Sequence, residues 1–195
     1  MSTGPIAIET AAANDQHYEL PAQFFGLALG PRRKYSGCFW PEGVEALADA
    51  EETMLALTCA RAGIVDGMEI LDLGCGYGEF INHIRCRARH AMDLNPSAPD
   101  HLAPDVQFHF QDCSRHWEIP DASLDVVFTS NFFEHLPDKL ALKLTLLEAA
   151  RCLRPGGRLI AFDCDPAAVA RALADPPAAA PRFLARRARF SELTA

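Results

Sequence analysis

The feature that most constrains this 195-residue chain lies between residues 68 and 78, where an apolar run meets closely spaced glycines. Residues 70–73 fit a strand buried in a sheet, interrupted by the acid Asp72. Glycine then recurs at alternate positions, as Gly74, Gly76 and Gly78. Such glycines permit a tight turn and let a ligand approach bare backbone where a helix begins, here over 79–87. The stretch predicts a nucleotide-binding turn.

Strand-like and helix-like segments alternate after this turn. Further strands are expected over 89–93, 106–110, 124–129 and 158–163. A helix is expected over 138–153, with Leu140, Leu144 and Leu147 sharing one face. This alternation predicts an α/β fold in which a doubly wound parallel sheet is covered on both faces.

Residues 17–63 precede the sheet and are rich in aromatic and aliphatic side chains, so we expect a helical lid after a flexible N-terminus over 1–16. The lid should contain a short helix over 22–29, an ordered loop, and a helix over 42–62 that ends at Gly63. The face expected to pack inward contains Leu47, Ala50, Met54 and Leu57. The acids in the first half of this helix are expected to form a solvated face. Composition leaves open whether the lid only covers the core or closes over a ligand.

The predicted sheet domain spans 64–164, and a tail rich in alanine, proline and arginine follows over 165–195. No strand is expected in the tail, although 169–174 and 181–190 could form short helices. Its arginines fit a solvated end better than a binding surface.

Composition excludes several classes of function. The net charge of −8 and pI of about 5.3 give no general signal for nucleic-acid binding. No apolar stretch approaches the roughly 20 residues of a membrane helix, and the N-terminus does not have the pattern of a secretory signal. Seven cysteines without a Cys-x-x-Cys pair favour reduced thiols in a cytoplasmic protein and no metal site.

Three acids indicate which nucleotide fits. Asp72, Asp93 and Asp112 stand at the carboxyl ends of three successive predicted strands, where doubly wound sheets bind ligands. Asp72 would repel a diphosphate but attract an ammonium group, Asp93 can accept the ribose hydroxyls, and Asp112 can accept an adenine amine. A ligand with an amino-acid end and an adenosine end therefore fits better than NAD. Each acid alone could equally be a helix cap.

These motifs resemble class I S-adenosylmethionine-dependent methyltransferases, most closely the type 11 group of small-molecule enzymes. Residues 72–78 resemble their motif I, Asp93 matches the ribose-binding acid, and Asp112 matches the adenine-contacting acid. Residues 153–159 resemble the signature before the fifth strand. The resemblance implies a Rossmann-like sheet of about five strands in the order 3-2-1-4-5, with S-adenosylmethionine as cofactor. The expected cofactor contacts within this core are Asp72, Gly74, Gly76, Asp93, Leu94, Asp112, Cys113 and Asn131.

A second resemblance covers about residues 15–62, which are similar to the lid of cyclopropane fatty acid synthases and coclaurine-type N-methyltransferases. It implies that Tyr35 and Ser36 contact the methionine end of the cofactor. Residues 133–136 are similar to a segment of the same family, which implies that Glu134 and His135 are catalytic and handle the substrate proton.

The chain departs from this family at two points. In cyclopropane synthases the corresponding lid segment resembles Tyr-Ser-Cys, but this chain has Gly37 in the place of the cysteine. This difference weakens the interpretation that the chain cyclopropanates lipids. The family continues after the fifth strand with a substrate-binding region and two more strands, which suggests a shortened methyltransferase. The edge of the fifth strand would then need the tail, a second copy or a partner to cover it. The sequence predicts a methyltransferase for a small-molecule or lipid-like acceptor; the alternative is an inactive cofactor-binding or interaction module.

Overall fold

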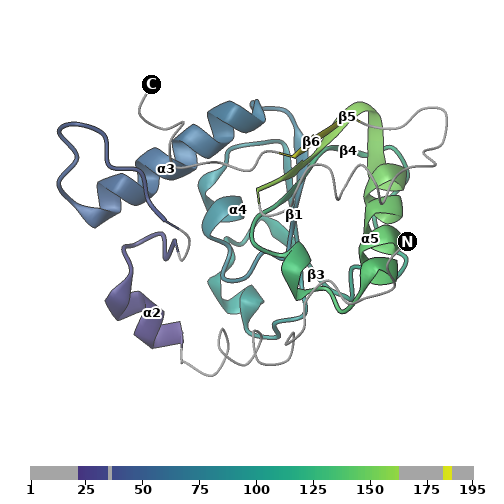
Figure 1. The fold of residues 1–195 in the computed structure, drawn as a ribbon, viewed down its shortest axis with the longest axis horizontal. Coiled ribbons are helices and arrows are strands. Elements are labelled where there is room, and N and C mark those ends of the chain that lie inside the picture. The colour runs from purple at the N-terminus through teal and green to yellow at the C-terminus, as the bar shows by residue number, and fades with distance from the viewer. Residues whose placement is uncertain (1–21, 35–36, 163–181, 186–195) are drawn as a thin grey trace.

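A parallel sheet forms the centre of the molecule (Figure 1). The structure is a computed structural model that describes residues 22–34, 37–162 and 182–185. Its strands, in the spatial order β3-β2-β1-β4-β5-β6, are all parallel: β1 (Glu69–Leu73), β2 (Ala88–Asp93), β3 (Val106–Phe110), β4 (Leu124–Thr129), β5 (Leu153–Ala161) and β6 (Arg182–Ala185). The helices are α2 (Ala22–Ala28), α3 (Leu47–Ala62), α4 (Glu79–His83) and α5 (Lys139–Cys152), with the 3-10 turns η1 (Ala98–His101) and η2 (Phe133–His135).

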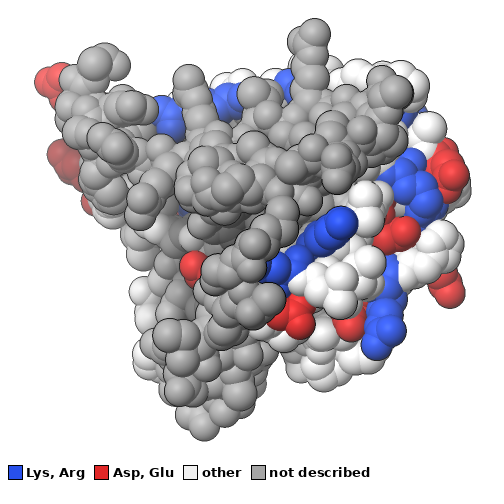
Figure 2. Space-filling model, turned by 45° about the vertical axis from the view of Figure 1, so that its right-hand side comes forward, with Lys and Arg blue, Asp and Glu red and all other residues white. Residues whose placement is uncertain are grey.

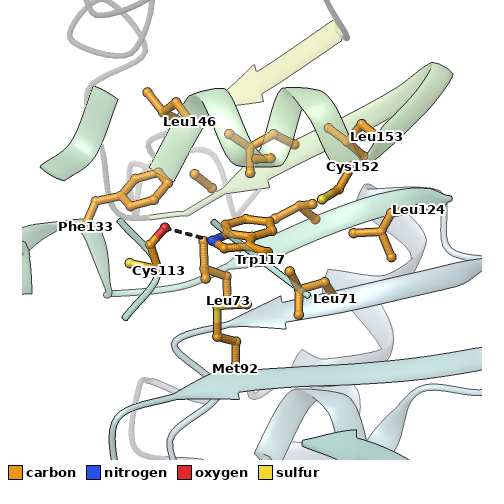
Figure 3. Packing of buried hydrophobic residues seen from close by; sticks show 14 of the residues in the cluster. Leu71, Leu73, Met92, Cys113, Trp117, Leu124, Phe133, Leu146, Cys152 and Leu153 are labelled. Atoms are coloured by element: carbon orange, nitrogen blue, oxygen red, sulfur yellow. Dashed lines mark hydrogen bonds between the residues drawn. The ribbon is translucent and has the colours of Figure 1, made fainter. Parts of the chain in front are cut away.

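The two faces of the sheet are covered by different helices, which gives three layers (Figure 1). On one face, α5 packs Leu142 and Leu146 against a cluster that includes Leu71, Val127 and the fully buried Trp117 (Figure 3). On the other face, α3 and α4 pack against a second cluster of buried residues, which includes Leu55, Ile70, Phe80, Ile81, Val126 and Ile160. Burial on both faces explains why the central strands are almost continuously apolar.

The predicted strand order 3-2-1-4-5 is confirmed, but the prediction that the tail contains no strand is wrong. Residues Arg182–Ala185 form β6, which pairs in parallel with β5. The suggested helix over 181–190 is therefore wrong at these positions, and the other suggested tail helix lies outside the described residues. Because β6 takes up the hydrogen bonds of β5, the tail itself covers the edge that the sequence left open.

In α3 and α5 the face marked by apolar spacing is not the buried one, except that Ala50 of α3 is buried. In α5, Leu140, Leu144 and Leu147 are exposed, and the buried positions include the small residues Ala141, Thr145 and Ala149. In α3 the buried positions are Ala50, Glu51, Leu55, Thr58 and Ala62. Several faces of each helix have apolar residues at helical spacing, so spacing alone does not choose between them. Small residues on the buried face let the helix backbone lie closer to the sheet than large ones would.

Several predicted boundaries also change. The helix predicted from 42 begins instead at Leu47, because residues before it turn at Gly43, whose φ is +85°. The helix predicted over 79–87 ends at His83. The fifth strand begins directly after α5, at Leu153, five residues before its predicted start. Gly156, with a φ of +84°, lies at a bulge within the strand. Gly63 ends α3 in the left-handed conformation, as predicted.

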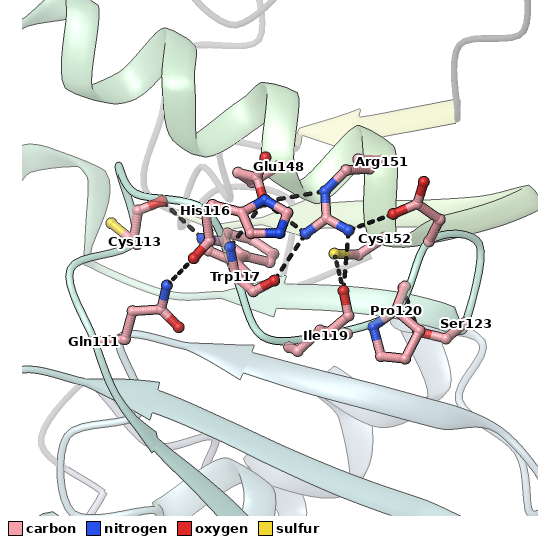
Figure 4. A network of polar contacts seen from close by, with 11 residues as sticks. Gln111, Cys113, His116, Trp117, Ile119, Pro120, Ser123, Glu148, Arg151 and Cys152 are labelled. Atoms are coloured by element: carbon pink, nitrogen blue, oxygen red, sulfur yellow. Dashed lines mark hydrogen bonds and ion pairs between the residues drawn. The ribbon is translucent and has the colours of Figure 1, made fainter.

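A partly buried ion pair on α5 fixes the segment that follows β3 (Figure 4). Arg151 donates to the carbonyl oxygens of Trp117 and Ile119, each at 3.0 Å, and pairs with Glu148 at 2.6 Å. The backbone N–H of Trp117 donates to Glu148 at 2.9 Å. Because Asp112 and Cys113 precede this segment, the network helps to place them at the carboxyl end of the sheet.

Acidic and basic side chains are interspersed on the described part of the face in Figure 2. Among the described residues, no helix has both the length and the apolar composition required to cross a bilayer.

Candidate functional site

The glycine turn between β1 and α4 is a strained segment that only glycine accepts easily. Gly74, Gly76 and Gly78 have φ values of +72°, +54° and +79°, in the left-handed region. A Cβ at Gly74 would overlap the ring of Phe132, whereas a Cβ at Gly76 would meet no atom within 4 Å. The turn thus packs tightly on one side and presents open backbone at Gly76, where a ligand can approach.

Asp93, the last residue of β2, holds this turn. Its two carboxylate oxygens accept hydrogen bonds from the backbone N–H groups of Gly76 and Asn95, each at 2.8 Å. Burial raises the pKa of Asp93, and these hydrogen bonds together with the nearby His135 oppose the rise. Each carboxylate oxygen has a second lone pair, so Asp93 can still accept a hydroxyl from a ligand. Leu94, next in the chain, is 59% exposed.

Three carboxylates converge at the turn. Asp72 is buried, and desolvation followed by the charges of Glu79 and Asp93 raises its pKa well above the ordinary value. Burial raises the pKa of Glu79 to about 7, and the charge of Lys34 partly opposes this shift. Burial lowers the pKa of Lys34, and the charge of Glu79 opposes this shift. Three acids against one lysine make this part of the site suited to a cationic group.

The lid touches the glycine turn and so does more than cover the core. The ring of Phe25 in α2 lies against Tyr77 of the turn, with ring centroids 6.0 Å apart, and Tyr77 meets His101 edge to face at 5.0 Å. Arg33 binds His101 with a nitrogen-to-nitrogen distance of 2.9 Å. Tyr35 and Ser36, the predicted contacts to the methionine end of a cofactor, lie outside the described residues.

The expectation that the acids of the 42–62 segment are all solvated is wrong for Glu51. Its side chain has no exposed surface, and it accepts hydrogen bonds from the backbone N–H groups of Gly30, Arg32 and Lys34. A buried carboxylate needs such partners, because an unpaired buried charge is costly. Glu51 therefore ties the lid loop to α3.

The site residues after β3 have mainly local bonds. One oxygen of Asp112 accepts from the N–H and hydroxyl of Ser114, at 2.9 and 2.8 Å, and the other lies 3.6 Å from Arg115. The Cys113 thiol is buried beside Thr145, and its carbonyl oxygen accepts the indole N–H of Trp117 at 2.8 Å (Figure 3). The Cys113 side chain thus belongs to the core. Contact between these two residues and a cofactor stays a prediction.

The segment after β4 brings the predicted catalytic residues to the same edge of the sheet. Asn131 is exposed and has a φ of +51°, which turns the chain toward η2. Glu134 is exposed, and His135 is partly buried, with its backbone N–H bonded to the Phe132 carbonyl oxygen at 2.9 Å. The charge of His135 partly opposes the rise in the pKa of Asp93.

Sequence reasoning missed three charged residues here: Lys34, Glu51 and Glu79. Glu79 directly follows the last glycine of the turn, and this position is the signal that could have placed it at the site. Lys34 directly precedes the predicted contact Tyr35. Glu51 gave no separate signal, because it is one of several acids in its segment.

Known proteins resemble this chain in sequence and in fold. The family model described as "Methyltransferase domain" matches residues 45–190. (S)-coclaurine N-methyltransferase of Thalictrum flavum subsp. glaucum is 44% identical over 143 residues, 67% of this chain and 39% of that protein. Methoxy mycolic acid synthase MmaA3 of Mycobacterium tuberculosis is 35% identical over 79 residues, 40% of this chain and 26% of that protein. These matches cover well under half of the relatives' length.

Two solved structures share the fold. Coclaurine N-methyltransferase, bound to N-methylheliamine and SAH, has a TM-score of 0.65 and 27% identity, over 79% of this chain and 46% of that one. Mycolic acid cyclopropane synthase CmaA1 has a TM-score of 0.56 and 21% identity, over 71% of this chain and 54% of that one. At this identity the similarity supports the fold alone. The family match covers well over half of the sequence, and so the chain belongs to the methyltransferase-domain family.

Proposed function

We propose that the chain binds S-adenosylmethionine and transfers its methyl group to a small-molecule or lipid-like acceptor. One observation carries the proposal: Asp72, Glu79 and Asp93 converge on a glycine turn that presents open backbone at Gly76. When bound, S-adenosylmethionine supplies a methyl group made electrophilic by its sulfonium.

The charges at the turn favour this ligand over a dinucleotide. S-adenosylmethionine carries a sulfonium and an ammonium group, whereas NAD brings a pyrophosphate that the three carboxylates would repel. Asp93 is available to the ribose hydroxyls, and the exposed Leu94 offers an apolar surface for the adenine ring. Asp72 and Glu79 suit the ammonium end.

An amine is the first acceptor to test, because several similar proteins are named as N-methyltransferases. The lipid-like alternative has support from the similarity to MmaA3. We also propose that the protein works in the cytoplasm, where thiols stay reduced, because the six cysteines among the described residues are free.

Calorimetric titration tests the proposal. S-adenosylmethionine and S-adenosylhomocysteine should both bind, and NAD should bind far more weakly. Transfer of a labelled methyl group is then measured with cyclic secondary amines and with vesicles of unsaturated phospholipid. Absence of binding by both cofactor forms contradicts the proposal. Binding without transfer to any acceptor favours the cofactor-binding module instead.

Replacing His135 with alanine is expected to lower the rate of methyl transfer by about 10²–10⁴-fold, the usual contribution of a general base. His135 lies at the carboxyl edge of the sheet near Asp93, where it can accept a proton from the attacking group. The affinity for S-adenosylhomocysteine should change by less than about threefold, because affinity does not depend on a proton acceptor. Single-turnover rates measure the first effect and calorimetry the second.

Two variants provide the comparison. His116→Ala removes a largely exposed histidine on another segment and should leave the rate unchanged. Glu134→Gln tests the neighbouring exposed acid. Unchanged turnover of His135→Ala, with a strong loss in Glu134→Gln, would assign the proton acceptor to Glu134 instead.

A further inference from the structure

The lid loop is fixed by one side chain. Glu51 on α3 accepts the backbone N–H groups of Gly30 and Lys34 at its Oε1, both at 3.0 Å, and that of Arg32 at its Oε2, at 2.9 Å. The donors are alternate residues of one loop, so a single buried carboxylate determines the path of its backbone. Hydrogen bonds to a charged acceptor are stronger than those between neutral groups, which makes this a firm attachment.

The helix that carries Glu51 is itself anchored in the core. Leu55 and Ala62 of α3 are buried against the sheet, and Arg158 of β5 donates to the carbonyl oxygen of Gly63 at 3.0 Å. Glu51 therefore holds the loop against a fixed support.

The attached loop ends at Lys34, which directly precedes the two predicted lid contacts in the sequence. The last of the three N–H donors, that of Lys34, is one residue before Tyr35. The Lys34 side chain is buried, and the charge of Glu79 acts on it. Glu79 is the first residue of α4, directly after the glycine turn. Glu51 thus fixes the backbone of Lys34, whose side chain interacts electrostatically with Glu79 of the site.

We propose that Glu51 is a positioning residue for the amino-acid end of the cofactor, acting through the backbone of residues 30–34, which sets the place of the buried Lys34 side chain. The inference rests on the proposed function, because it requires that S-adenosylmethionine binds at the glycine turn. It predicts that Glu51 affects one end of the ligand and leaves the adenosine end unaffected.

Two ligands separate this role from a general contribution to folding. S-adenosylhomocysteine has both ends, whereas 5′-deoxy-5′-methylthioadenosine has the adenosine end without the amino acid. Glu51→Gln keeps the shape but directs an amide NH₂ at a backbone N–H, so one bond to the loop is lost. We expect the Kd for S-adenosylhomocysteine to rise about tenfold and the Kd for methylthioadenosine to change less than about twofold. The control, Glu45→Gln, alters an exposed acid and should change neither.

A glycine pair gives an independent test from the other side of the contact. A Cβ at Gly30 would overlap the Glu51 carboxylate, whereas a Cβ at Gly37 would meet no atom within 4 Å. Gly30→Ala should reproduce the selective loss for S-adenosylhomocysteine, and Gly37→Ala should not. If neither Glu51→Gln nor Gly30→Ala folds, hydrogen exchange of the unmodified protein decides: S-adenosylhomocysteine should slow exchange over residues 30–36 more than methylthioadenosine does.

The outcomes separate this inference from the proposed function. If the unmodified protein binds neither ligand, the proposed function fails, and this inference fails with it. If both ligands bind, but Glu51→Gln weakens both equally or neither, the positioning role is overturned and the proposed function stands. Equal protection of residues 30–36 by the two ligands also overturns it.

Discussion

Replacing Asp93 with alanine is expected to weaken the binding of S-adenosylmethionine by at least about a hundredfold. The carboxylate accepts the backbone N–H groups of Gly76 and Asn95, and the substitution removes both bonds together with the acceptor for the ribose. Each hydrogen bond to a charged group is worth about 1.5–3 kcal/mol, and about 1.4 kcal/mol corresponds to a tenfold change in affinity. Calorimetry with S-adenosylhomocysteine measures the loss.

Two further substitutions make this result interpretable. Asp93→Asn keeps one oxygen acceptor, so it should retain one of the two backbone bonds and show an intermediate loss. Asp105→Ala removes an exposed aspartate that pairs with Arg89, and it should leave the affinity unchanged. If Asp93→Ala folds and binds as tightly as the unmodified protein, the assignment of the cofactor to this turn is wrong.

Replacing Gly74 with alanine is expected to lower the free energy of unfolding by about 2–5 kcal/mol. The left-handed conformation at a φ of +72° costs a residue with a Cβ about 1–2 kcal/mol. In addition, the new Cβ overlaps the ring of Phe132, and crowding in a packed interior typically costs a further 1–3 kcal/mol. Urea unfolding followed by circular dichroism measures the change.

The matched control is Gly67→Ala, because Gly67 has a φ of +87° but no atom within 4 Å of a Cβ. Gly67→Ala should show the conformational cost without the overlap. In Gly74→Ala/Phe132→Ala the overlap with the ring is removed and only the Phe132 Cβ, at 2.9 Å, remains close, so the double variant should lose less stability than the two single changes summed. If Gly74→Ala is no less stable than Gly67→Ala, the close contact with Phe132 is not part of the native turn.

The order of the sheet and the family were predictable because short motifs carry them. The glycine turn, the acids that follow the strands and the apolar runs of β3 and β4 depend on local chemistry, and the bounds of β3 and β4 are as predicted. The division into a lid over 17–63 and a core over 64–164 stays a prediction.

The buried faces of α3 and α5 were not predictable in the same way. Leu140, Leu144 and Leu147 have helical spacing, yet they are exposed, and the buried face combines Leu142 and Leu146 with the smaller Ala141, Thr145 and Ala149. Which face packs inward depends on how closely two surfaces can approach, and this is a property of the partner surface as well as of the helix.

The candidate site was predictable only where a residue directly follows a strand. Asp93 ends β2 and His135 lies in the short segment that follows β4, whereas Glu51 binds the backbone N–H groups of a loop about twenty residues away in sequence. When a carboxylate binds backbone N–H groups, any residue type can be its partner. The sequence therefore contains no complementary side chain that would reveal the contact. The edge strand β6 was missed for a related reason: its four residues gain their structure from pairing with β5.

The ion pair of Arg151 and Glu148 has a consequence for how the segment after β3 tolerates mutation. The pair forms hydrogen bonds with main-chain atoms: the carbonyl oxygens of Trp117 and Ile119 and the N–H of Trp117. These bonds do not depend on the side chains at those positions. Of the exposed side chains in residues 116–121, His116 and Asp121 also pair with Glu148 and Arg151, and substituting them would remove those ion pairs but leave the main-chain bonds. An insertion or deletion there would move the carbonyl groups out of register with the guanidinium. This segment should therefore tolerate many substitutions but few changes in its length.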